Sequence, residues 1–118
     1  INLANNNLSY FDFENLHFYQ DLYHLDLSFN RIEKLSSVAK MVKNNFSILN
    51  LNHNQINSIS SNFFHYFYSL TRLDLSENPI SSLDSNQFKN MLKLSYLNMS
   101  TNYLTEISPI LFSDQNGL

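Results

Sequence analysis

The side chains most able to carry catalysis or hold a metal are few in this sequence, and their spacing builds no site. The histidines lack the close pairing typical of metal ligands; they are His17, His24, His53 and His65. Cysteine is absent, so the chain has neither a thiolate metal site nor a thiol nucleophile. The single glycine excludes a Gly-rich phosphate loop and a Gly-x-Ser-x-Gly nucleophile turn. We therefore expect no enzyme, no metal and no cofactor.

Asp26 and Asp74 form a carboxylate pair with a repeated context, since each stands in a Leu-Asp-Leu-Ser segment. This alternation is typical of a short strand. If the two segments form strands of one sheet with a single strand between them, the two carboxylates lie about 10 Å apart. Carboxyl groups about 6.5–9.5 Å apart can hydrolyse glycosides with inversion. An open strand face, however, offers no cleft that would raise one pKa. We expect instead a weak surface ion pair between Asp74 and Arg72.

Composition excludes several classes of partner. The 118 residues suffice for one modest domain and carry a net charge of −3, so no basic face is expected to bind nucleic acid or anionic lipid. The most apolar run, from Phe63 to Tyr68, is far shorter than the roughly 18 residues that span a bilayer. We therefore predict no nucleic-acid partner and no membrane insertion by this segment.

A period of 24 residues organises the whole chain. Aliphatic side chains recur in several columns, among them Leu25, Leu49, Leu73 and Leu97 and, two places on, Leu3, Leu27, Leu51, Leu75 and Met99. An asparagine recurs at the same interval, at Asn6, Asn30, Asn54, Asn78 and Asn102. A period of this length predicts stacked structural repeats, in which neighbouring units bury the apolar face that one unit cannot bury alone.

The unit reads L-x-x-L-x-L-x-x-N-x-L-x-x-L, as in Leu70–Leu83, and in this it resembles the leucine-rich repeat family over the whole chain. The resemblance implies an α/β fold, a right-handed horseshoe-shaped solenoid with a parallel concave sheet. The predicted domain is a fragment, 1–118, made of a partial repeat (1–21) and the repeats 22–45, 46–69, 70–93 and 94–117. No caps are included, so we expect flanking repeats or caps in the full-length chain. The isolated ends would expose core, and we expect them to associate.

The asparagine column explains how a chain with one glycine leaves its strands. A buried amide both donates to and accepts from turn backbone, which satisfies groups that would otherwise have no partner. We predict that these side chains form a ladder that bridges consecutive turns and makes the exits from the strands.

The outer segments resemble the 24-residue subtype found in extracellular proteins such as Toll-like receptors and small leucine-rich proteoglycans. Its second apolar seam would contain Leu16, Phe64, Phe88 and Phe112, followed three residues later by Tyr19, Phe67 and Met91. Within the aromatic run, Phe64 and Phe67 are expected in the seam and the others partly exposed. The repeat 22–45 departs with Lys40, and Val38, Met41 and Val42 have the spacing of a short amphipathic helix.

Three Asn-x-Ser sequons begin at Asn7, Asn45 and Asn98. Asn45 lies in an expected loop and is the better acceptor if the protein is secreted, with Asn7 the second candidate. A glycan at Asn98 would stand on the concave sheet and block it.

The concave sheet is where the resemblance places ligand binding. The Asp/Asn and Ser columns of the strands repeat the family pattern and carry little individual information. The residues before the second leucine and before the asparagine vary more, and they include types common at interface hot spots. We predict contacts to a partner by His24, Phe29, Ile48, His53, Arg72, Glu77 and Tyr96.

The predicted function is therefore recognition of a macromolecule, with a protein ligand preferred. The resemblance favours an extracellular or cell-surface receptor-like glycoprotein that acts in signal transduction. The alternative is an intracellular, cytoplasmic scaffold or regulatory subunit that uses the same face.

Overall fold

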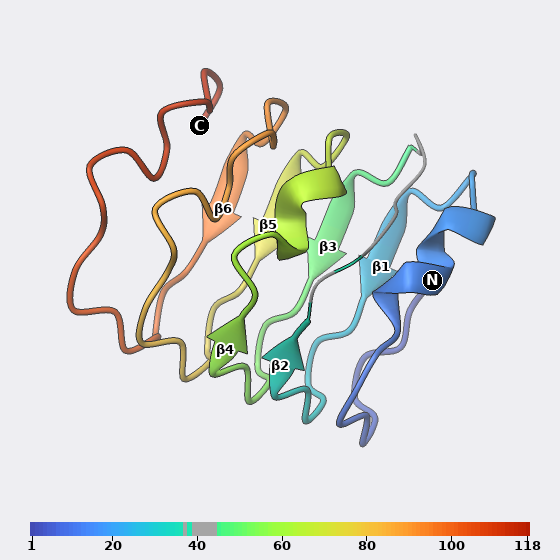
Figure 1. Ribbon diagram of the computed structural model, residues 1–118. Coiled ribbons are helices and arrows are strands. Elements are labelled where there is room, and N and C mark those ends of the chain that lie inside the picture. The colour runs from blue at the N-terminus through green and yellow to red at the C-terminus, as the bar shows by residue number, and fades with distance from the viewer. Residues whose placement is uncertain (37, 39–44) are drawn as a thin grey trace.

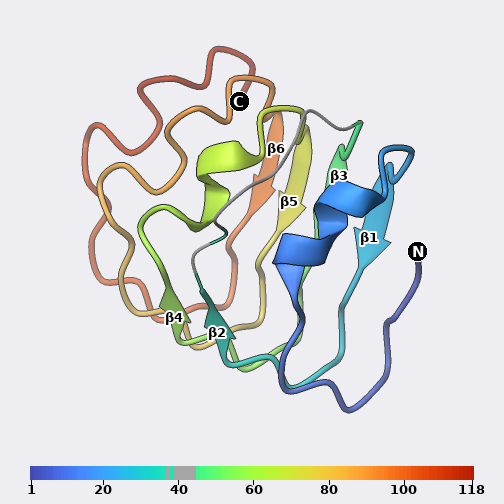
Figure 2. The same cartoon turned by 45° about the vertical axis from the view of Figure 1, so that its right-hand side comes forward.

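The computed structural model describes residues 1–36, 38 and 45–118, which wind into successive coils (Figure 1). Each complete coil contributes one strand to a four-stranded parallel sheet of order β1-β3-β5-β6. Its strands are β1 (His24–Asp26), β3 (Ile48–Asn50), β5 (Arg72–Asp74) and β6 (Tyr96–Asn98). A parallel pair, β2 (Lys34–Leu35) with β4 (Ser58–Ile59), lies where the coils turn back. Figure 2 shows this pair side by side, apart from the larger sheet.

Residues that are 24 positions apart in the sequence are paired in neighbouring strands of the sheet. Leu25 pairs with Leu49, Leu49 with Leu73, and Leu73 with Leu97. An isolated parallel bridge between Asn2 and Asp26 adds the first coil to the same series. Equivalent positions therefore stand one above another, and this confirms the predicted leucine-rich solenoid architecture; the curvature of a horseshoe stays a prediction for so short an array.

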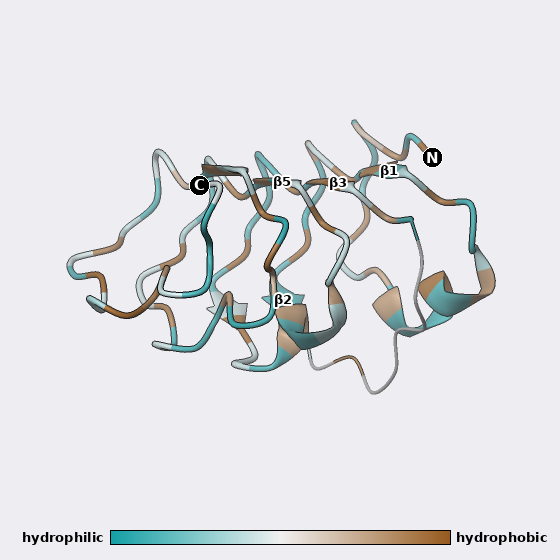
Figure 3. Cartoon of the chain, turned by 90° about the horizontal axis from the view of Figure 1, so that it is seen from above, coloured by the Kyte–Doolittle hydropathy of each residue, from teal (hydrophilic) through white to brown (hydrophobic). Residues whose placement is uncertain are grey.

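The core lies between the strands and the outer segments. Figure 3 shows strands β1, β3 and β5 of the larger sheet along one side of the molecule and the helices on the opposite side. The aliphatic columns fill the space between, with near-zero exposure for Leu25, Leu27, Ile32, Leu49, Leu51, Ile56, Leu70, Leu73 and Leu75. Because each of these side chains packs against its equivalent one coil away, the burial is shared between neighbours, as the period predicts.

The helices of the outer segments are 3-10 helices, η1 (Phe13–Phe18) and η2 (Phe63–Tyr66). Asp12 caps η1 by accepting a hydrogen bond from the backbone N–H of Glu14. Phe64 and Phe67 are buried in the predicted seam. The prediction was wrong for Phe63, which is fully buried, because its ring packs edge-on against Phe13 at 5.0 Å.

The seam weakens in the end coils. Tyr19 was predicted to lie in it but is 54% exposed, and Phe112 is 36% exposed. Side chains in the first and last coils have a neighbour on one side only within this chain, so less of their surface is covered. Val38 is buried, whereas Lys40, Met41 and Val42, the rest of the expected amphipathic helix, lie outside the described residues.

The predicted ladder is confirmed for four asparagine side chains that span neighbouring coils, those of Asn30, Asn54, Asn78 and Asn102, but not for Asn6, which lies in the first coil and bonds only within it. Asn54 Nδ2 donates to the carbonyls of Leu27 (3.0 Å) in the preceding coil and Leu51 (3.1 Å) in its own, and Asn54 Oδ1 accepts from the Ile32 backbone N–H at 3.0 Å. The same pattern recurs one coil on, where Asn78 Oδ1 accepts from the Ile56 N–H at 3.0 Å. Each amide thus supplies the backbone partners that the strand exit lacks.

Asn54→Ala is expected to lower the free energy of unfolding by about 2 kcal/mol, because the fully buried Ile32 N–H loses its acceptor. Urea denaturation measures the change. The matched control is Asn6→Ala, since Asn6 is exposed and its amide donates only within its own coil, to Leu3 and Ala4. Equal effects of the two substitutions would contradict a stabilising link between coils.

Candidate functional site

The residues at the starts of the strands form a row across the sheet. The register aligns His24, Ile48, Arg72 and Tyr96. His24, Arg72 and Tyr96 are exposed and Ile48 is half-buried, so this row of four predicted contact residues lies on the solvent-facing side. We call it the strand-start row. It brings together an imidazole, an aliphatic chain, a guanidinium and a phenol, of which arginine and tyrosine are common at interface hot spots.

Arg72 and Tyr96 are paired across adjacent strands. The guanidinium carbon of Arg72 lies 4.2 Å from the centre of the Tyr96 ring, within the range of a cation–π contact. The predicted ion pair of Arg72 with Asp74 is wrong. The Asp74 carboxylate instead accepts from the Ser76 backbone N–H at 2.9 Å and the Ser76 hydroxyl at 2.6 Å. The cation–π contact between Arg72 and Tyr96 therefore orders two long side chains before any partner binds.

Asp26 and Asp74 make hydrogen bonds within their own coils, and this structural role explains why the residue type repeats. Asp26 Oδ1 accepts from the backbone N–H and the hydroxyl of Ser28, at 3.0 and 2.6 Å, as Asp74 does from Ser76. Asn98 and Ser100 repeat the arrangement. These three pairs, whose polar groups already have partners, lie along the middle of the face, and we call them the polar strip. In the coil between the first two pairs, Asn50 Oδ1 accepts from the Asn52 backbone N–H at 3.2 Å, whereas Asn52 Oδ1 is buried without a partner among the described residues.

The residues just before the ladder asparagines adopt left-handed backbone conformations. Phe29, His53 and Glu77 have φ values of 54°, 50° and 55°, and Asn5 (57°) and Thr101 (55°) continue the column. The expectation that the asparagines of the ladder make the turns is thus corrected: the preceding residue reverses the chain, and the asparagine amide then satisfies the backbone. Non-glycine residues in this region carry strain of about 1–3 kcal/mol each. The positive φ values could not be predicted from the sequence, because this column contains five different residue types.

This left-handed column places the three remaining predicted contact residues in one hollow. The rings of Phe29 and His53 stack with centres 4.2 Å apart and planes 15° apart. A hollow of about 420 Å³ lies against them and is lined by Asn6, Phe29, Asn30, Arg31, His53, Asn54, Gln55 and Glu77. We call it the rim groove. The seven predicted contacts therefore divide between the strand-start row and the rim groove, with the polar strip between them.

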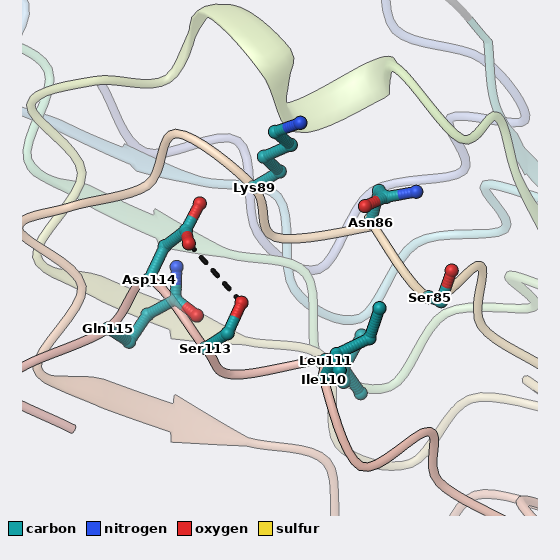
Figure 4. Close-up of a pocket in the computed structure, with 8 residues that line it drawn as sticks. All are labelled: Ser85, Asn86, Lys89, Ile110, Leu111, Ser113, Asp114 and Gln115. Atoms are coloured by element: carbon teal, nitrogen blue, oxygen red, sulfur yellow. Dashed lines mark hydrogen bonds between the residues drawn. The ribbon is translucent and has the colours of Figure 1, made fainter.

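A smaller cavity lies on the outer side near the C-terminus and was not predicted from the sequence. It has a volume of about 170 Å³, and its lining side chains are labelled in Figure 4. Gln115 is 8% exposed; its Nε2 donates to the Phe88 carbonyl at 2.8 Å, while its Oε1 has no hydrogen-bond partner among the described residues. Ser113 donates to Asp114 at 3.2 Å beside it. Gln115 replaces an apolar residue of the seam column of Phe67 and Met91, so periodicity alone predicted no polar site there.

The described part of the chain contains no cluster of three or more histidine, cysteine or acidic side chains that could hold a metal ion. Nor does it contain a helix of the length and apolar character needed to cross a bilayer.

Stacked 24-residue coils with an amide ladder and an accessible strand face define a solenoid repeat protein. A family model described as leucine rich repeat matches residues 20–80 and 68–118. The chain belongs to the leucine-rich repeat family, whose domains generally mediate protein–protein interaction and are typically non-enzymatic binding modules. No curated protein sequence matches the chain.

Thr101→Gly is expected to raise the free energy of unfolding by about 0.5–1 kcal/mol. A β-branched residue is especially unfavourable at positive φ, and the relief exceeds the entropy that glycine adds to the unfolded chain. The control is Thr105→Gly, another exposed threonine, whose φ is not positive and whose replacement should destabilise by about 0.5–1 kcal/mol. Destabilisation by both substitutions, measured in urea, would show that the left-handed column stores no strain.

Proposed function

We propose that this chain is part of an extracellular or cell-surface, receptor-like leucine-rich-repeat ectodomain that recognises a protein through its strand face. The observation that carries the proposal is the strand-start row, where Arg72 and Tyr96 stand accessible and held against each other. Such preordering lowers the entropic cost of binding, since two flexible side chains already share one geometry. Ile48, which pairs with Arg72 from the adjacent strand, adds an apolar side chain that a partner can contact.

The polar strip contributes less to this recognition. Its carboxylates and hydroxyls already bond to each other and to backbone, so a partner gains little from contacting them. The partner is therefore expected to draw its affinity from the strand-start row and the rim groove. Five coils at about 4.8 Å span only roughly 20 Å, so this segment supplies part of a standard interface of about 800 Å² per partner.

An extracellular setting is supported by the sequons and by the exposure of two of their asparagines. Asn7 and Asn45 are exposed, whereas Asn98 lies half-buried in β6 with its amide donating to Asp74 Oδ2 at 3.4 Å. Glycans at Asn7 and Asn45 stand outside the strand-start row, and one at Asn98 would crowd Tyr96. We therefore propose Asn7 and Asn45 as the glycosylated positions.

The double variant Arg72→Ala/Tyr96→Ala is expected to bind the partner at least about tenfold more weakly, because both hot-spot side chains are removed. Affinity capture from the native source with quantitative mass spectrometry identifies proteins lost with this variant, and titration of the purified partner measures the change. The control is Tyr103→Ala, which removes a tyrosine that is 70% exposed and lies outside both surfaces. Equal capture of the partner by the unmodified protein, the double variant and the Tyr103 variant would show that the binding surface does not include the strand-start row.

An antibody against this chain is expected to label intact, unpermeabilised cells of the native source. Peptide N-glycosidase treatment should increase the electrophoretic mobility of the native protein, and Asn45→Gln should remove part of that shift. Labelling only after permeabilisation, together with unchanged mobility, would instead support the intracellular scaffold.

A further inference from the structure

The rim groove presents an aromatic stack beside a carboxylate. Phe29, His53 and Glu77 come from successive coils, at the turns that follow β1, β3 and β5 (Figure 1). The rings of Phe29 and His53 lie almost parallel, and Glu77 follows one coil further along the same column. Since equivalent positions advance by about 4.8 Å per coil, the second face of the His53 ring is directed toward the coil that carries Glu77.

The Glu77 carboxylate has no hydrogen bond or ion pair with the part of the chain that the structure describes. It differs in this from Asp26 and Asp74, whose carboxylates are bonded to the following serines. The nearest cation in the groove is Arg31, two coils away, so about 10 Å of spacing separates the two positions. An exposed anion in the lining of the same groove as the aromatic stack is therefore available to a partner.

The backbone holds these side chains in place at an energetic cost. All three residues are at positive φ, where glycine would fit without strain, yet the column carries a phenyl, an imidazole and a carboxylate. The same conformation recurs at Asn5 and Thr101, so it belongs to the coil, and the three side chains distinguish this stretch of the column. All three side chains are exposed, Phe29 to 48%.

We propose that the rim groove binds an arginine side chain of the protein partner. A planar guanidinium can stack on the open face of His53 while its N–H groups donate to the Glu77 carboxylate. The net charge of −3 favours a basic partner segment in general. This inference rests on the proposed function, because it names the partner chemistry that one half of the strand face selects.

The test is a titration of the 15N-labelled full-length protein that carries these repeats with N-acetyl-arginine amide, followed by chemical-shift changes of the backbone amides. Saturable changes centred on Phe29, His53 and Glu77 are expected, with a dissociation constant on the order of 1–10 mM. N-acetyl-citrulline amide has nearly the same shape without the charge and should bind at least about fivefold more weakly.

Glu77→Gln should weaken arginine binding about threefold, and Glu106→Gln, which removes an exposed carboxylate outside the groove, should leave it unchanged. His53→Asn removes the ring but keeps a residue that tolerates positive φ, and it should also weaken binding about threefold. Equal binding of arginine and citrulline, or equal affinity of the Glu77 and Glu106 variants, would overturn the proposal. Neither result depends on Arg72 or Tyr96, so a failure here is distinct from a failure of the strand-start row.

Discussion

The structure depends on a hydrogen-bonding constraint: backbone groups at the exit of each strand are buried, and their partners come from an asparagine amide that reaches between coils. Asn54 donates to Leu27 one coil back and to Leu51 in its own coil, while accepting from Ile32 one coil back. A single coil cannot satisfy this requirement alone. Coils are thus stabilised as neighbours, and the free energy of folding is approximately a sum of coil and interface contributions.

The same constraint creates the two binding surfaces. Because the amides hold successive strand exits in one register, residues separated by 24 positions stand above each other, and their side chains interact across coils. The stack of Phe29 on His53 and the contact of Arg72 with Tyr96 are both consequences of this alignment. Each pair joins residues that are 24 apart, so surface chemistry is organised along the axis of the solenoid.

Periodicity in the sequence was sufficient to predict the buried columns, the parallel register and the amide ladder, because each depends on residue type at a repeated place. Periodicity was insufficient where contacts with other segments determine whether a side chain is buried or which residue it contacts. Arg72 has Asp74 on its own strand, but Tyr96 on the adjacent strand is the partner that it contacts. Phe63 was misjudged for a similar reason: its position holds Asn15, Ala39, Gln87 and Leu111 in other coils, so residue type shows no consistent pattern there. Its ring is covered by Phe13, from another segment of the fold, and by Phe67.

The backbone strain at the rim was hidden for a different reason. A positive φ in other proteins is signalled by glycine or asparagine, and here the column holds Asn5, Phe29, His53, Glu77 and Thr101. The amide ladder imposes the conformation from outside, so the residue that adopts it is free to vary. That freedom matters for recognition. The polar strip must keep its side chains to bond the strand exits, whereas the strained positions can change from coil to coil without loss of the fold. Specificity for a partner is therefore expected to reside where the fold dictates the conformation of the backbone but not the identity of the side chain.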